Sequence, residues 1–247
     1  MSLRVRIIGS SVVSNSVTYG YVVPCVSYIG GAGVVNGSTE GGDVVMLYGS
    51  NFGPVGTPVD YVVYGRGVVV GSNPLTVSTT VYYGQGCSVF VAHSVIRCTT
   101  SPGVGSGLVW GFSVFGQRGS LCAGSSTTNV TSGYASPVIT GAVVVSSPDA
   151  PAGLLQTEGG STVLVTGFNF GPVGNATLFF DGDVVSTLVQ SDHRSAWFTC
   201  APGSGLNKQL RMVTGGLSSG VNATLSYAAP NITGLSTLPG MCWKRQC

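Results

Sequence analysis

The sequence predicts an all-β fold of tandem β-sandwiches, and three observations predict it. Apolar residues come in runs of about four to six, broken by Gly, Pro, Asn and Ser, with no helical periodicity. A stretch running from Glu-Gly-Gly through a strand to Asn-Phe-Gly occurs twice, within residues 39–56 and 157–174. The motif Tyr-x-x-Pro occurs at residues 21–24, 134–137 and 227–230. We therefore expect one structural unit to be repeated along the chain.

The composition limits the partners that the chain can have. Only 7% of its 247 residues are charged and the formal net charge is +2, whereas ordinary soluble proteins are about 25% charged. The Lys and Arg residues are scattered, so no basic face for nucleic acid is expected. No apolar run approaches the roughly 20 residues of a membrane-spanning helix. The sequence thus disfavours nucleic acid as a partner and membrane insertion by this segment.

The Tyr-x-x-Pro motifs set the expected domain boundaries, because proline suits the first residues of an edge strand. Complete modules are expected at residues 21–133 and 134–226. Residues 1–20 resemble the end of the second module, so they are expected to be the tail strands of a preceding module or a donor strand. Residues 227–247 are expected to start a following module or to act as a donor strand. The N-terminus lacks the apolar core of a signal peptide, which favours a removed leader or a longer chain.

Alternation along the repeated strand predicts which side chains face the core. In the first copy Val45 and Leu47 should point inward, which leaves Val44, Met46 and Tyr48 on the outer face. The second copy has Thr162, Leu164 and Thr166 at the outer positions, mostly hydroxyl side chains. Glycine and asparagine after the strand supply the positive φ of a turn, and the Phe between them can plug the end of the sandwich.

The first module carries an insert near residues 57–78, compared with the second. Residues 61–70 have the signature of a hairpin that turns at Gly65-Arg66-Gly67. This hairpin either covers the outer face of its own module or offers an apolar patch or strand edge to another subunit. The second alternative defines a candidate assembly interface of eight residues: Val44, Met46, Tyr48, Tyr61, Val62, Tyr64, Arg66 and Val68.

Cysteines and glycosylation sequons favour an extracellular location. Cys87 and Cys98 bracket a short segment and are expected to form a disulfide. The second copy is expected to keep the later cysteine as Cys200 but to have residues 183–185 in place of the earlier one. The partners of Cys25, Cys122, Cys200, Cys242 and Cys247 stay open, and the odd total implies a free or intermolecular cysteine. Five asparagines stand in N-glycosylation sequons: Asn36, Asn129, Asn175, Asn222 and Asn231.

The order of the motifs carries a family resemblance. Tyr-x-x-Pro, Glu-Gly-Gly, a strand, Gly-x-Asn-Phe-Gly and a later cysteine followed by Pro-Gly together resemble the IPT/TIG family of immunoglobulin-like domains. That family occurs in plexins and related receptors, in repeat-bearing cell-surface proteins and in some transcription factors. The resemblance covers both complete modules and implies an immunoglobulin-like sandwich for each. The first module departs from the pattern between Thr57 and Ser78, and the second lacks the earlier cysteine.

No catalytic or metal-binding pattern stands out. His93 and His193 occupy matching places in the repeat, which favours a structural role. The sequence has no nucleophile elbow, P-loop, zinc spacing or calcium loop, so we expect no enzyme activity, cofactor or metal.

The sequence therefore favours an extracellular structural or adhesive repeat protein, such as a glycosylated filament or surface-layer subunit that binds other copies of itself or protein partners. The first alternative is the ligand-binding ectodomain of a cell-surface receptor. The second is a carbohydrate-binding module of a secreted enzyme, in which Trp110, Trp197 or Trp243 would stack on sugar rings.

Overall fold

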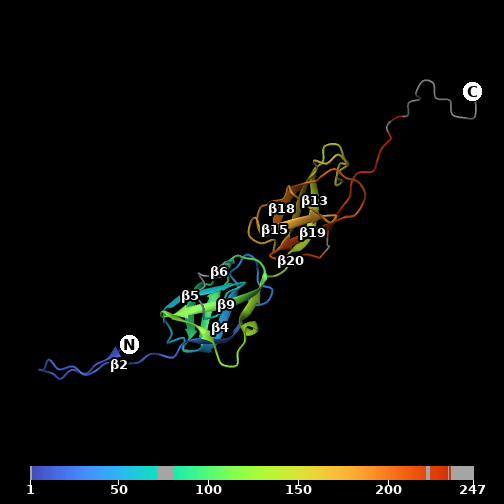
Figure 1. Ribbon diagram of the computed structural model, residues 1–247. Coiled ribbons are helices and arrows are strands. Elements are labelled where there is room, and N and C mark those ends of the chain that lie inside the picture. Colours follow the sequence, from blue (N-terminus) through green and yellow to red (C-terminus); the bar gives the residue numbers. More distant parts are fainter. Residues whose placement is uncertain (1, 72–79, 221–222, 233, 235–247) are drawn as a thin grey trace, which may run out of the picture.

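Two β-sandwiches follow each other end to end in the computed structural model, which describes residues 2–71, 80–220, 223–232 and 234 (Figure 1). Each sandwich packs two mainly antiparallel sheets around its own core. The predicted all-β fold of tandem immunoglobulin-like sandwiches is confirmed. Residues 72–79, which include the last part of the predicted insert, and most of the segment after residue 232 lie outside the described residues.

The first module is built on two five-stranded sheets. One has the order β11 (Ser120–Leu121), β3 (Cys25–Gly30), β4 (Val44–Ser50), β8 (Val95–Thr99) and β7 (Gln85–Val91). The other has the order β10 (Gln117–Arg118), β9 (Ser106–Val114), β5 (Val59–Gly65) and β6 (Val81–Tyr83), and β12 (Thr131–Gly133) also pairs with β9. The 3-10 helix η2 (Thr127–Val130) precedes β12.

The second module follows the same plan, with a four-stranded sheet facing a five-stranded one. Its first sheet has the order β13 (Val138–Ser146), β14 (Thr162–Phe168), β18 (Ser195–Thr199) and β17 (Val189–Gln190). The facing sheet has the order β16 (Asp183–Val184), β15 (Ala176–Phe180), β19 (Lys208–Thr214) and β20 (Leu217–Ser218), and β21 (Ala223–Leu225) also pairs with β19.

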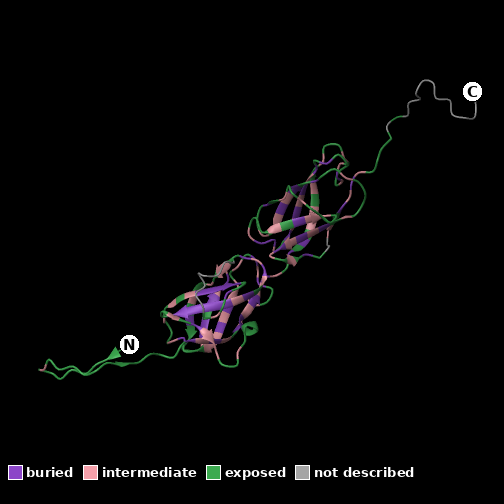
Figure 2. Cartoon of the chain, in the orientation of Figure 1, coloured by how far each residue is buried: buried purple, intermediate pink, exposed green. Residues whose placement is uncertain are grey.

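The predicted alternation along the repeated strand is confirmed. Val45 and Leu47 are fully buried between the sheets, while Val44, Met46 and Tyr48 are half-buried on the outer face. The strand must also approach its neighbour closely, because a side chain at Gly49 would overlap the carbonyl oxygen of Cys25. Figure 2 shows buried residues alternating with less buried ones along the strands.

The turn after the repeated strand also folds as expected. Asn51 and Asn169 adopt left-handed φ values of 65° and 60°, a region that asparagine tolerates better than most residues. Phe52 and Phe170 are fully buried beneath these turns, so each phenylalanine seals one end of its sandwich.

The tyrosine of Tyr-x-x-Pro closes a module instead of opening the next one. Tyr134 belongs to the first core, where its hydroxyl lies 2.7 Å from that of Tyr64. Tyr227 belongs in the same way to the second core. The expected module start at the tyrosine is therefore wrong for this side chain, because a large aromatic ring at a strand end is best buried against the sheet it has just left.

An N-terminal hairpin precedes the first module. Its strands β1 (Ser2–Leu3) and β2 (Val17–Thr18) pair with each other, and an isolated bridge joins Arg6 to Val13. Figure 1 shows the hairpin extending away from the first sandwich, and Figure 2 shows it exposed along nearly its whole length.

Candidate functional site

The junction between the two modules is made largely of the two copies of the repeated stretch. The first copy supplies Thr39 and Glu40 from the loop before β4, and the second supplies Asn169 from the turn after β14. The turn before β18 adds His193 and Arg194. Motifs that are far apart in the sequence therefore meet because one end of the first sandwich faces the opposite end of the second (Figure 1).

Direct polar contacts hold this junction. Thr39 Oγ1 lies 2.9 Å from His193 Nδ1, and the Thr39 amide donates to Asn169 Oδ1 at 3.5 Å. Arg194 Nε donates to Glu40 Oε1 at 2.7 Å in an exposed ion pair. The hydrogen bond from Arg194 holds the pKa of the Glu40 carboxyl below its usual range and raises the pKa of Arg194. Exposed ion pairs are weak, so the pair orients the modules more than it stabilises them.

Close backbone packing completes the junction on the other side of the linker. Arg66 Nη2 donates to the Gly215 carbonyl at 3.4 Å. A side chain at Gly215 would overlap the backbone of Gly105, and one at Gly171 would overlap the Val104 side chain. Glycine is needed at these positions because the two sandwiches approach each other too closely for a Cβ.

The linker between the modules is also tied down. The Ala135 amide donates to the Gly37 carbonyl at 2.8 Å, and the Gly37 amide donates to the Gly133 carbonyl at 3.1 Å. The second module repeats this arrangement where the chain leaves it, because the Ala228 amide donates to the Leu155 carbonyl at 2.8 Å. Where the chain leaves each described module, the same type of backbone hydrogen bond thus fixes the direction of the chain.

The outer ends of the two modules, which lie away from the junction, carry the same groups as the junction. Thr39 is 1% exposed in the junction, whereas its counterpart Thr157 is exposed on the second module. At the opposite end, Asn51 and His93 of the first module are exposed, whereas their counterparts in the junction are half-buried. Each outer end therefore presents one half of a junction. No pattern in the sequence marks this site, because the fold of each module alone explains a repeated Glu-Gly-Gly.

The eight residues of the candidate assembly interface do not form one surface. Val44, Met46 and Tyr48 lie on the outer face of β4, whereas β5 lies in the opposite sheet between β9 and β6. On β5, Val62 and Tyr64 are buried in the core, and Tyr64 stacks on Trp110 at 4.2 Å between ring centroids. The remaining members are Tyr61 on β5, and Arg66 and Val68 in the connection that follows it.

The expected hairpin at Gly65-Arg66-Gly67 is therefore wrong. β5 matches β15 of the second module, since each pairs with the long strand of its own sheet. The additional residues lie between β5 and β6, where the second module has the turn Asp181-Gly182. Val68 in this connection is buried beside Gly111 and Val63. The connection covers the outer face of β5 and β9, and not that of β4.

The outer face of β4 is covered by its own neighbours. The Tyr48 ring stacks on Tyr28 of β3 with 4.5 Å between ring centroids, and the Tyr48 hydroxyl lies 3.3 Å from the Met46 sulfur. The second module is also less polar on this face than predicted. Directly opposed residues of four adjacent strands form an apolar row there: Val143, Leu164, Trp197 and Val189.

The cysteines are arranged differently in the two modules. Cys87 and Cys98 form a disulfide across β7 and β8, and a second disulfide joins Cys25 to Cys122. Cys200 is buried and free. It does not take the place of Cys98, because Val163 pairs with Phe198 where Val45 pairs with Cys98. The prediction that Cys200 corresponds to Cys98 is therefore wrong by two residues. Both cysteines are followed by Pro-Gly, but this Pro-Gly lies closer to Cys200 than to Cys98, so it does not mark equivalent cysteines. Cys242 and Cys247 lie outside the described residues.

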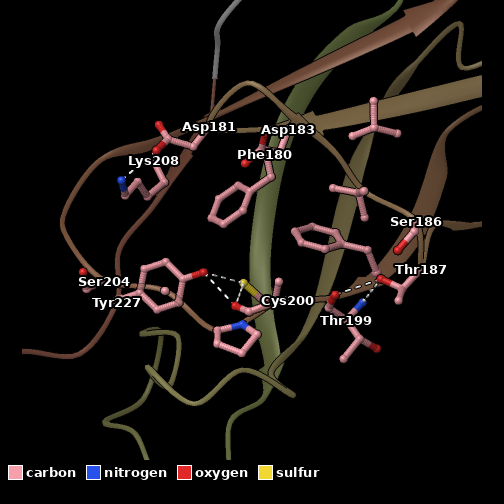
Figure 3. A pocket seen from close by; sticks show the side chains of 16 residues that line it. Phe180, Asp181, Asp183, Ser186, Thr187, Thr199, Cys200, Ser204, Lys208 and Tyr227 are labelled. Carbon is pink, nitrogen blue, oxygen red and sulfur yellow. Dashed lines mark hydrogen bonds and ion pairs between the residues drawn. The ribbon is translucent and has the colours of Figure 1, made fainter.

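A pocket opens beside Cys200 in the second module, with a volume of about 330 Å³ (Figure 3). Phe180, Phe198 and Tyr227 line it together with the thiol. The Cys200 sulfur lies 3.1 Å from the Tyr227 hydroxyl, and burial raises the pKa of both groups. At the rim, Lys208 and Asp181 form an ion pair at 2.6 Å. These groups are bonded within the chain, so the thiol is a protonated core side chain and not an activated nucleophile.

The remaining candidate residues are placed as follows. Four sequon asparagines are exposed, namely Asn36, Asn129, Asn175 and Asn231, while Asn222 lies outside the described residues. Trp110 is buried with its indole donating to Ser132, and Trp197 is half-buried, whereas Trp243 is not among the described residues.

Metal-binding clusters and membrane-spanning helices are both absent from the part of the chain that the structure describes. No group of three or more His, Cys, Asp or Glu side chains there is placed to hold a metal ion. No helix in that part is long and apolar enough to cross a bilayer.

Comparisons with known proteins find distant structural likeness. No family model and no curated protein matches the chain. SGBP-B from a xyloglucan utilisation locus of Bacteroides uniformis is 16% identical, with a TM-score of 0.30 over 83% of this chain and 50% of that one. A structure with xylogluco-oligosaccharide is 15% identical, with a TM-score of 0.34 over 88% and 43%. The extracellular region of plexin A4 is 13% identical, with a TM-score of 0.33 over 83% and 18%. The chain spans half or less of each of these structures.

Proposed function

We propose that this chain is a non-enzymatic extracellular structural protein whose IPT/TIG-like modules stack head to tail, and that the outer ends of its two modules continue the stack with other copies of the chain. The observation that carries the proposal is the junction, in which Thr39 of one module is buried against His193 of the next. Thr157 and His93 offer the same two groups, exposed in this chain, at the outer ends.

A junction between two copies of the chain would keep some contacts of the junction within the chain and lose one of them. Asn51 and His93 can meet Thr157 as Asn169 and His193 meet Thr39. Ser94 stands where Arg194 is, so the ion pair to the glutamate is replaced by a neutral contact. Association between copies should therefore be weaker than the junction within the chain, which is also held by its short linker.

The setting of the molecule supports an extracellular role. Two disulfides are typical of proteins from oxidising compartments, and glycans on the exposed sequons would help to solvate a surface with few charges. The stacked tyrosines Tyr28 and Tyr48 offer a lateral apolar surface along such a rod. The pocket beside Cys200 has no part in this proposal.

Sedimentation velocity on the full chain, from about 1 µM to about 1 mM, tests the proposal. We expect end-to-end oligomers that grow with concentration and appear as strings in electron microscopy. Thr157→Arg should abolish them by placing a bulky cation in the free half-junction. Val143→Arg, at an exposed position on β13 that belongs to no sequon, is the control and should leave assembly unchanged. A wild-type chain that stays monomeric over the whole range would contradict the proposal.

A further inference from the structure

We infer that the N-terminal hairpin is the last hairpin of an immunoglobulin-like sandwich, and that its partner is an incomplete module consisting of the strands that precede this hairpin. This goes beyond the stacking of complete modules, because it concerns strands exchanged into a core. The hairpin is defined as residues 2–18, from β1 to β2.

Local geometry identifies the hairpin. The Val5 amide donates to Ser14 Oγ at 2.9 Å, and the Ser14 amide donates back to the Val5 carbonyl at 2.9 Å. In the last hairpin of the second module, the Met212 amide donates to Ser219 Oγ at 2.8 Å, and the Ser219 amide donates back at 2.8 Å. The same pair of reciprocal hydrogen bonds to a serine thus occurs in both hairpins. The two first-strand residues of these pairs, Val5 and Met212, lie equally far from the turns of their hairpins.

The turn and the flanking sequence agree with this match. Gly9 has a φ of 83° and Gly216 has a φ of 81°, a left-handed conformation that glycine adopts without strain. Leu3-Arg4-Val5 corresponds to Leu210-Arg211-Met212, and Tyr21 follows the hairpin as Tyr227 follows its counterpart.

Burial shows what the hairpin lacks. Leu210, Met212 and Thr214 point into the second core and are 0%, 0% and 2% exposed. Their counterparts Leu3, Val5 and Ile7 are 59%, 64% and 64% exposed, although they are as apolar or more so. Moving such side chains from water into a core stabilises the folded state. The face that is a core face in the second module is therefore left in water here (Figure 2).

The match between the N-terminal hairpin and the last hairpin of the second module also indicates the chemistry of the partner. It must supply an apolar inner face and a free strand edge equivalent to β15, which pairs with β19 along its length. Arg211 lies over the ring of its cross-strand neighbour Phe179, with its guanidinium carbon 4.1 Å from the ring centroid. The partner strand should likewise carry an aromatic residue opposite Arg4.

A graft within the full chain tests this inference, with the second module as an acceptor of known structure. Residues 208–226 are replaced by a copy of residues 1–20, so that Leu3 takes the place of Leu210 and the chain continues at Tyr227. Amide hydrogen exchange is then measured in β14 and β15. We expect protection in the graft to stay within about tenfold of the wild type, with amides of the grafted strand slowed at least about a hundredfold relative to the original hairpin.

Two substituted grafts test whether the second module needs the inward side chains of the copied hairpin or accepts any hairpin of this length. A graft carrying Leu3→Ser and Val5→Ser in the copied hairpin should lose protection of the second module, because its inward side chains are removed. A graft carrying Arg4→Ser and Arg6→Ser should keep it. A graft whose second module exchanges as an unfolded chain, or equal behaviour of the two substituted grafts, would overturn the inference. None of these variants alters Thr157 or the first module, so the outcome is separate from the test of head-to-tail assembly.

Discussion

Buried tyrosine hydroxyls close each sandwich at the point where the chain leaves it. The Tyr134 hydroxyl donates to the Ser101 carbonyl at 2.6 Å and lies 2.7 Å from the Tyr64 hydroxyl. Tyr227 makes the equivalent bond to the Ala201 carbonyl at 2.9 Å. Burial raises the pKa of Tyr64 and Tyr134 above the ordinary value near 10. The neutral hydroxyls are thus part of the folded state.

Removing one hydroxyl should destabilise one module only. We expect Tyr134→Phe to lower the free energy of unfolding of the first module by about 1–2 kcal/mol, because it removes a buried hydrogen-bonded pair. Urea unfolding followed by module-specific amide signals measures this. Tyr227→Phe is the matched control and should affect the second module instead.

The same tyrosines make stability depend on alkaline pH. Their pKa is raised in the folded state, so the unfolded chain releases protons first as the pH passes about 10. The stabilisation is complete below that pH and is lost as the pH rises further. The Tyr134→Phe variant should show a shallower loss for the first module, and an unchanged slope would contradict this assignment.

At the level of strands, the two modules close their sheets by different means. Cys25–Cys122 ties the parallel pair β3 and β11 over a sequence separation of 97, and Cys87–Cys98 ties β7 to β8 over a separation of 11. The described part of the second module has no disulfide, and there Gln190 pins the turn after β14 through its buried amide, which donates to the Phe170 carbonyl.

The two disulfides should contribute unequally. Replacing Cys25 and Cys122 by Ser should destabilise the first module by about 2–4 kcal/mol, because the longer loop gains more entropy in the unfolded chain. Replacing Cys87 and Cys98 should cost roughly 2 kcal/mol less. Calorimetry of the full chain measures both, with the transition of the second module as the internal control. An equal effect of the two replacements would argue against this loop-length account.

Local patterns predicted the strands better than their partners. The sidedness of residues 44–48 was predictable because side chains alternate strictly along a strand. The place of β5 was not, since two short apolar runs around a Gly-rich turn fit a hairpin as well as a strand followed by a long connection. Likewise, Cys200 was matched to Cys98 by residue type, although register across β14 and β18 decides the equivalence. Pairing between distant strands leaves no local signal.

At the scale of the whole molecule, the junction turns two sandwiches into one rod. None of its residues was predicted as a site, because Thr39 and His193 meet only after both modules have folded. Contacts between individual residues at the facing ends of two modules thus set the direction of the next module. The second module is thereby held in one fixed direction relative to the first.

Residual dipolar couplings on the full chain test that claim most directly. We expect one alignment tensor to fit both modules of the wild type. Thr39→Arg should separate the modules into two tensors, because its side chain is buried in the junction, while each module keeps its own amide spectrum. Thr157→Arg, the same change at the exposed equivalent position, should leave one tensor, measured at a concentration where the chain is monomeric. Two independent tensors in the wild-type chain would contradict a fixed junction.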